Sequence, residues 1–219
     1  MKKILSILMS AAFFNMMAYA QENVVELRGG FSPAPRFDVS PSKEGKASYE
    51  IGAEYRYRVT ENTEIGGGIA YQKHGKLKGF TDIDTSTLRV DVLDMELYDS
   101  VPLYATVRYS FRNTTSITPY VKANIGYSFN INNKNYSNYE TYNKTTGALV
   151  DSGKLKELEA GSGMYYAVGA GIEYRGLTVD LSYQITRADM KGVRYDGAQD
   201  SGTADNRRVT LGIRYQFSF

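Results

Sequence analysis

The residue types that most often carry out catalytic or redox chemistry are scarce in this chain. Its 219 residues include no cysteine and a single histidine, His74. The absence of cysteine excludes disulfides, thiolate zinc sites and thiol nucleophiles. One histidine is too few for a site with several histidine ligands. We therefore expect no enzyme activity, no cofactor and no bound metal.

His74 is the candidate for acid–base catalysis, and the stretch that follows it carries Asp82, Asp84 and Ser86. A hydrolytic site built from these residues would need the histidine beside the serine, with a carboxylate to orient the ring. The spacing does not indicate such an arrangement. We interpret His74 as a solvated residue at the rim of a strand. The carboxylates of this stretch also lack the pattern of a calcium-binding loop.

A larger set of charged residues recurs with a period of two, the repeat of a β-strand. In residues 49–59, for example, Glu50, Glu54, Arg56 and Arg58 alternate with tyrosine and aliphatic residues. Eight segments show such alternation: 25–31, 49–59, 64–72, 101–111, 120–129, 166–175, 177–185 and 208–219. Tilted strands of about this length can cross the hydrocarbon core of a membrane.

The connections between these segments alternate in length. Short turns at 60–63, 112–116 and 175–176 separate long, polar connections at 32–47, 73–97, 130–163 and 187–206. Short turns at one rim and long loops at the other are typical of outer-membrane barrels with both termini in the periplasm. The sequence therefore predicts an all-β fold, an eight-stranded antiparallel up-and-down transmembrane barrel, as one domain over residues 21–219.

Residues 1–20 have the three parts of a signal peptide in order. Lys2 and Lys3 precede an apolar stretch that ends in Ala18-Tyr19-Ala20, a small-x-small cleavage pattern. Removal of the two lysines lowers the net charge from +2 to zero, with 24 basic and 24 acidic residues left. Neutral balance offers no electrostatic basis for binding nucleic acid. We expect an exported protein that begins at Gln21.

The alternation leaves open which row of side chains faces outward. In a soluble eight-stranded barrel the apolar row fills the interior, whereas in a membrane barrel it faces lipid. Three features favour the membrane. The polar row is rich in glycine, tyrosines recur near the ends of the apolar row, and the chain ends at an aromatic residue, Phe219.

If the apolar row faces lipid, the charged row lines the lumen. The predicted lumen network consists of Glu26, Arg28, Glu50, Glu54, Arg56, Arg58, Glu64, Arg108, Lys122, Glu173, Asp180, Arg208 and Arg214. Its six acids and seven bases nearly cancel, so we expect them to pair across strands. An eight-stranded barrel is just wide enough for its own side chains. This favours a filled lumen over an ion-selective pore.

The last residues, Val-Thr-Leu-Gly-Ile-Arg-Tyr-Gln-Phe-Ser-Phe (209–219), resemble the C-terminal signal read by the barrel-assembly machinery of Gram-negative bacteria. Its aromatic positions are Tyr215, Phe217 and Phe219. Segments 101–111 and 118–127 resemble small barrels grouped with OmpX, the OmpA transmembrane domain and the opacity proteins. The resemblance implies a monomer in the outer membrane, with periplasmic termini and extracellular loops, in contact with membrane lipids and lipopolysaccharide.

The resemblance also implies a non-enzymatic role in envelope integrity or surface adhesion. A host surface ligand would contact the long loops, where Tyr136, Tyr139 and Tyr142 are candidate binding residues in a polar loop that we expect to be mobile. The alternative is a narrow channel for ions or small solutes, as in OmpW-like barrels. A lipid-modifying enzyme centred on His74 is a third hypothesis. Residues 88–92 also alternate and are expected to extend the barrel strands with an edge that could pair with a foreign strand.

Overall fold

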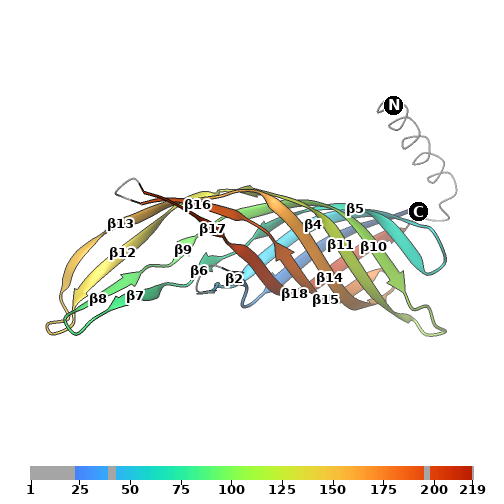
Figure 1. The fold of residues 1–219 in the computed structure, drawn as a ribbon. Coiled ribbons are helices and arrows are strands. Elements are labelled where there is room, and N and C mark those ends of the chain that lie inside the picture. Colours follow the sequence, from blue (N-terminus) through green and yellow to red (C-terminus); the bar gives the residue numbers. More distant parts are fainter. Residues whose placement is uncertain (1–22, 39–42, 195–197, 219) are drawn as a thin grey trace, which may run out of the picture.

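The eight alternating segments form the strands of a closed antiparallel barrel, as predicted (Figure 1). In this computed structural model, residues 23–38, 43–194 and 198–218 are described. The predicted signal peptide at 1–20 and Phe219 lie outside these ranges. The described residues contain no helix with the length and apolar character needed to cross a membrane.

The barrel strands follow one another around the circumference. In chain order they are β1 (Asn23–Ser32), β4 (Ser48–Arg58), β5 (Thr63–Lys73), β10 (Asp99–Ser110), β11 (Ile117–Ile131), β14 (Gly163–Tyr174), β15 (Leu177–Thr186) and β18 (Asp205–Ser218). Each pairs with the next, and β1 pairs with β18 to close the barrel, with Val24 opposite Ser218.

The three short turns lie at the end of the barrel where the described chain also begins and ends. The tightest of them joins β14 to β15 through Arg175 and Gly176, whose φ angles are 50° and 83°. Positive φ at both central residues is the geometry of a type I′ hairpin, and glycine adopts it without strain. The predicted turn at 175–176 is therefore present.

The apolar row points outward and the polar row inward. Ile51 and Ile213 are 61% and 59% exposed on the outer wall, whereas Glu54 and Arg56 are 2% and 0% exposed inside. A soluble barrel would have the reverse arrangement. The outer wall is instead a continuous apolar surface of the kind that faces lipid.

The long connections contain strands, contrary to the prediction of polar loops. Within the described residues these are β2 (Arg36–Asp38), β3 (Lys43–Glu44), β6 (Lys76–Leu77), β7 (Phe80–Asp84), β8 (Leu88–Val92), β9 (Met95–Glu96), β12 (Lys134–Asn143), β13 (Leu149–Ala160), β16 (Asp189–Arg194) and β17 (Gln199–Thr203). Six of them form a second sheet, ordered β17-β16-β13-β12-β8-β7, which we call the external sheet. It projects from the barrel end opposite the short turns (Figure 1).

The predicted free edge at residues 88–92 is wrong. This segment forms β8, which is paired on both sides, with β7 and with β12. The edges of the external sheet are β7 and β17.

Where the external sheet meets the barrel, buried apolar side chains form a core that we call the mouth cluster. Its members are Phe37, Leu77, Leu97, Tyr98, Ala160, Ala188, Met190 and Ala204. They come from β2, β6, β13, β16 and the residues that flank β10, β16 and β18. This core joins the external sheet to the barrel over the end of the lumen.

Candidate functional site

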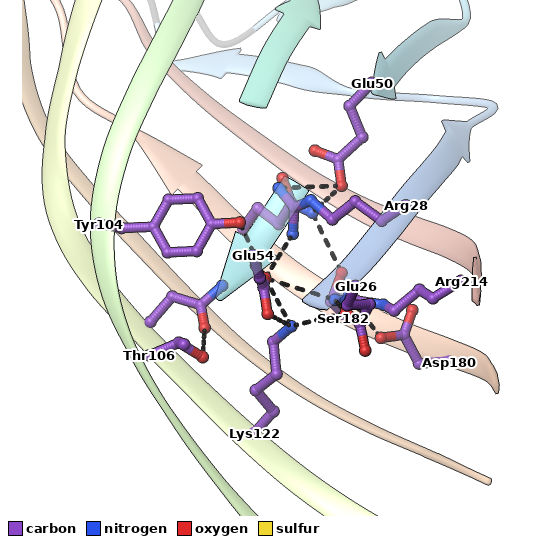
Figure 2. A network of polar contacts seen from close by, with 12 residues as sticks. Glu26, Arg28, Glu50, Glu54, Tyr104, Thr106, Lys122, Asp180, Ser182 and Arg214 are labelled. Atoms are coloured by element: carbon purple, nitrogen blue, oxygen red, sulfur yellow. Dashed lines mark hydrogen bonds and ion pairs between the residues drawn. The ribbon is translucent and has the colours of Figure 1, made fainter. Parts of the chain in front are cut away.

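Glu54 on β4 is the centre of the lumen network, with a fully buried side chain (0% exposed). Lys122 Nζ donates to both of its carboxylate oxygens, at 2.7 and 2.8 Å. Arg56 Nη1 and the Tyr104 hydroxyl donate to it at 2.7 and 2.8 Å. Arg214 Nη1 lies 3.5 Å from Oε1. Figure 2 shows Lys122 and Tyr104 pointing at this carboxylate from two different sides. Arg28 Nη1 lies 3.6 Å from the same Oε1 atom, so four cations surround one acid.

Glu26 on β1 provides the second negative charge at this level. Its carboxylate accepts hydrogen bonds from Arg56 Nη2 and Arg214 Nη1, each at 2.9 Å, and lies 3.7 Å from Lys122 Nζ. Arg214 also forms an ion pair with Asp180 at 2.5 Å. The acids therefore share their cations, and the shared pairs connect strands on all sides of the lumen.

Toward the short turns, the network continues to the rim. Arg108 forms an ion pair with Glu173. Arg56 Nε lies 3.0 Å from Glu64, which also pairs with Arg58 at 3.4 Å. The side chains of Arg58 and Glu173 are 16% and 22% exposed, so solvent reaches the network only at this edge of the described structure.

Toward the external sheet, Glu50 is the common partner of the surrounding polar side chains. Arg208 Nη2 donates to it at 2.6 Å, and Arg28 Nη2 lies 3.4 Å away. The side-chain amides of Gln72 and Gln184 each donate to it at 3.1 Å. Around Glu50, the network therefore contains hydrogen bonds from neutral glutamine amides as well as ion pairs.

The structure places all thirteen predicted lumen residues on the inner wall, and each forms an ion pair with another member of the set. Sequence reasoning missed the uncharged partners, which are Gln72, Tyr104, Tyr120, Gln184 and Gln216. They occupy the same alternate positions as the charged residues. Strand parity is therefore the signal that identifies them.

The network leaves little room for solutes. The lumen cavity beside Lys122 and Asp180 measures about 10 Å³, which is about the space for one water molecule. A Cβ atom at Gly68 would lie 2.7 Å from the Tyr104 ring, and one at Gly212 would lie 2.2 Å from the Asp180 carboxylate. Glycines in the polar row therefore make space for the large side chains opposite.

His74 closes the lumen beneath the mouth cluster, and the prediction that it is solvated is wrong. The residue is fully buried (0% exposed). Its ring centroid lies 6.4 Å from that of Phe37 and 5.0 Å from that of Tyr98, both edge-to-face. His74 continues the inward row of β5, and the chain turns away only at Gly75, whose φ is 77°.

His74 also forms a serine–histidine pair that the sequence spacing does not reveal. Its Nε2 lies 2.7 Å from Ser100 Oγ, and that hydroxyl donates its hydrogen to Asn130 Oδ1 at 2.7 Å. Ser100 must then accept a hydrogen from His74. A general base would instead accept the serine proton, so this pair has the wrong polarity for nucleophilic catalysis. The other residues of the hypothetical loop site lie on β7 and in the turn after it, in the external sheet: Asp82, Asp84 and Ser86.

Acidification is expected to destabilise the barrel mouth through His74. Burial and the nearby positive charge of Arg208 hold the pKa of His74 well below its usual value, although a hydrogen bond with Asn206 and the charge of Glu50 oppose this. Because the unfolded histidine has a higher pKa, the stabilisation is present above about pH 6.5 and is lost as the pH falls, by up to about 1.4 kcal/mol per pH unit. Thermal unfolding at neutral and acidic pH measures this loss. His74→Gln should show a smaller loss, and an identical pH dependence in both proteins would contradict the assignment.

Two of the three predicted assembly-signal residues lie on the last strand. Tyr215 and Phe217 on β18 face outward, 48% and 49% exposed, with ring centroids 4.9 Å apart. Phe219 lies outside the described residues. The assembly signal itself stays a prediction.

The three candidate loop tyrosines do not form one surface. They lie on β12, so the expected mobile loop is a strand. Tyr136 faces one side of the external sheet, where Lys154 Nζ lies 4.0 Å from its ring centroid. Tyr142 shares that side, because residues six apart on a strand point the same way. Tyr139 faces the other side and donates to Asp151 at 2.9 Å.

The family model for the outer membrane protein beta-barrel domain matches residues 6–217. The chain belongs to this family. This outer-membrane barrel is 27% identical over 239 residues to an uncharacterized protein of Pasteurella multocida (strain Pm70), covering 99% of this chain and 98% of the relative.

The barrel is also similar to solved outer-membrane proteins. Neisserial surface protein A is 15% identical, with 89% of this chain and 97% of that chain covered and a TM-score of 0.42. Ail of Yersinia pestis is 14% identical, with coverage of 90% and 98% and a TM-score of 0.41. OprG of Pseudomonas aeruginosa is 11% identical, with coverage of 90% and 96% and a TM-score of 0.49.

Proposed function

We propose that this protein is a monomeric, non-enzymatic outer-membrane barrel that serves envelope integrity or surface adhesion through its external sheet. The observation that supports this proposal is the filled lumen. Buried ion pairs occupy it from the rim to Glu50, and His74 and the mouth cluster cover it above. The external sheet is the large polar surface that remains for contacts with other molecules.

We place the external sheet outside the cell and the chain termini in the periplasm. The described chain ends lie with the short turns, and the external sheet lies at the opposite end. Short periplasmic turns and long extracellular elements are the usual topology of bacterial outer-membrane barrels.

The absence of enzymatic activity is supported by the surroundings of His74. The ring is enclosed by Phe37 and Tyr98, and its bond to Ser100 has the polarity opposite to that of a general base. A substrate would have to displace the mouth cluster to reach it.

Planar-bilayer recordings distinguish a filled barrel from the OmpW-like channel alternative. The refolded protein is expected to give no discrete conductance steps, because buried ion pairs fill the described lumen and the cavity beside Lys122 holds about one water molecule. Folding is verified by the different gel mobility of boiled and unboiled samples. Reproducible steps whose size changes in Glu54→Gln and Arg56→Gln variants would make the lumen a selective pore and overturn the proposal.

Adhesion is tested with the face of the external sheet that carries Tyr136. Tyr136 and Val193 lie on that face, 45% and 43% exposed, on either side of Glu157 in the register. Tyr136→Ser/Val193→Ser is expected to weaken saturable binding to host cells or matrix, whereas Ile83→Ser on the edge strand β7 serves as the matched control. If the wild-type protein shows no saturable binding, the adhesion role fails. Detergent sensitivity of a strain lacking the protein then tests the integrity role.

A further inference from the structure

A groove lies on the outer wall where β1 and β2 meet β18. β1 pairs with β18 as far as Phe31, and β2 resumes the pairing at Arg36. Pro33 and Pro35 stand between them. Proline has no backbone N–H and cannot continue the ladder. The chain therefore leaves the sheet here, and a groove of about 710 Å³ opens beside β18.

The groove changes from apolar to charged along its length. Leu211 and Val209 of β18, with Tyr183 of β15, line its apolar part. Arg207, Arg36 and Asp38 line its charged part. Leu211, Val209 and Arg207 occupy successive outward positions of β18, so about 13 Å of strand separates the first from the last. The groove therefore has the polarity of the boundary between hydrocarbon and lipid headgroups.

Two arginines stand directly opposite each other in the charged part. Arg36 of β2 pairs with Arg207 of β18. Like charges at such positions destabilise a sheet unless an anion lies between them. Asp38 neutralises Arg207 at 2.6 Å, but Glu44, the neighbour of Arg36, is bound to Lys78 at 2.9 Å. The cations here are Arg36, Arg207 and Lys78, and the carboxylates are Asp38 and Glu44. One positive charge is therefore in excess.

We propose that this groove binds a phosphorylated lipid of the outer leaflet. Its phosphate would lie between Arg36 and Arg207, and an acyl chain would follow Val209 and Leu211. Guanidinium groups bind phosphate oxygens through paired hydrogen bonds. This inference rests on the orientation proposed above, because that orientation places the two arginines at the outer leaflet.

A lipid fits the groove better than a free phosphate ion does. Free phosphate would occupy only the charged part and would leave the apolar part empty. The apolar part belongs to the lipid-facing row of the barrel wall, with Val209 and Leu211 49% and 53% exposed. The occupant must therefore have both an anionic headgroup and an apolar chain.

The test is a binding titration of the folded protein in detergent, read by native mass spectrometry. The probes are lipid A with its phosphates, lipid A without them, and inorganic phosphate. Phosphorylated lipid A is expected to bind at least about tenfold more tightly than the dephosphorylated form, as for loss of a charge-assisted hydrogen bond. Inorganic phosphate at equal concentration is expected not to compete. Equal affinity for the two lipids, or competition by inorganic phosphate, would overturn the proposal.

Variants locate the site. Arg36→Gln/Arg207→Gln is expected to weaken binding of phosphorylated lipid A at least about tenfold, while Arg36→Lys/Arg207→Lys retains part of the affinity. Lys134→Gln removes an outward cation elsewhere, 65% exposed and 3.5 Å from Glu159, and should leave the affinity unchanged. Unchanged affinity in the glutamine double variant, or an equal loss in Lys134→Gln, would exclude this groove.

These measurements do not depend on how the barrel is oriented in cells. Labelling of intact cells at the external sheet tests the orientation separately. If the label shows that sheet in the periplasm, the orientation fails and the lipid proposed for the outer leaflet fails with it, whatever the detergent titration gives. If the sheet is outside but binding is absent, only the lipid site fails.

Discussion

Replacing Glu54 by glutamine is expected to lower the free energy of unfolding by about 3–5 kcal/mol, because removing one partner of a buried ion pair leaves charge uncompensated. The loss is large because Lys122, Arg56 and Arg214 all lie within 3.5 Å of this carboxylate. Urea unfolding followed by circular dichroism measures it. The chain has no tryptophan, so fluorescence is less informative.

Two control variants show whether the stability loss of Glu54→Gln comes from breaking buried ion pairs or from removing a negative charge anywhere in the protein. Glu159→Gln breaks an exposed pair with Lys134 and should lower the free energy of unfolding by about 1 kcal/mol or less. Glu54→Gln/Lys122→Met should be destabilised by less than the sum of the single variants, because the double variant leaves less unpaired charge. Similar small losses for Glu54→Gln and Glu159→Gln would show that the lumen charges are hydrated rather than dry.

Replacing Tyr98 by alanine is expected to remove about 3–5 kcal/mol of stability from the mouth of the barrel, as for other large aromatic residues in cores. Tyr98 is 2% exposed, packs against Phe37 and His74, and donates to the Ala204 carbonyl at 2.7 Å. We expect the external sheet to loosen while the barrel stays closed. Hydrogen exchange should therefore increase in β12 and β13 but not in the barrel strands.

The matched control is Tyr98→Phe, which retains the ring and loses only the hydroxyl. It should cost about 1 kcal/mol and leave exchange in the external sheet nearly unchanged. Unchanged exchange in Tyr98→Ala would mean that hydrogen bonds between strands, rather than the mouth cluster, hold the external sheet in place.

The barrel could be predicted because each of its strands has two different environments. Lipid requires Ile51 and Ile213 on one face, and the narrow interior requires Glu54 and Arg56 on the other. Because of this contrast, apolar and polar residues alternate strictly along each barrel strand. The same contrast predicted the lumen residues, which are the charged residues at inward positions.

The external sheet could not be predicted in the same way because much of both faces contacts solvent. In β12, residues as polar as Lys134 and Asn138 are exposed on one face, and the other face contains Ser137 and Thr141. With no strong apolar row, the period of two disappears. The sequence of this Asn-rich segment therefore predicts a loop, although its backbone forms a strand that pairs with β13 and β8.

The environment of His74 was unpredictable for a different reason. Its burial depends on Phe37 and Tyr98, which lie 37 and 24 residues away in the sequence. No local pattern shows that these rings meet above the lumen. Parity with Gln72 indicates only that the histidine points inward.

The partners in the lumen network are far apart along the chain. Glu26 bonds to Arg214 over 188 residues, Glu50 to Arg208 over 158, and Gln72 to Gln184 over 112. The bonds of Glu26 and Glu50 require the last strand, β18, to lie close to the first two barrel strands, β1 and β4. Before closure, we expect the same charged row to face water. Closure then removes water from all of these groups together, so we expect barrel formation to end in one late, cooperative step.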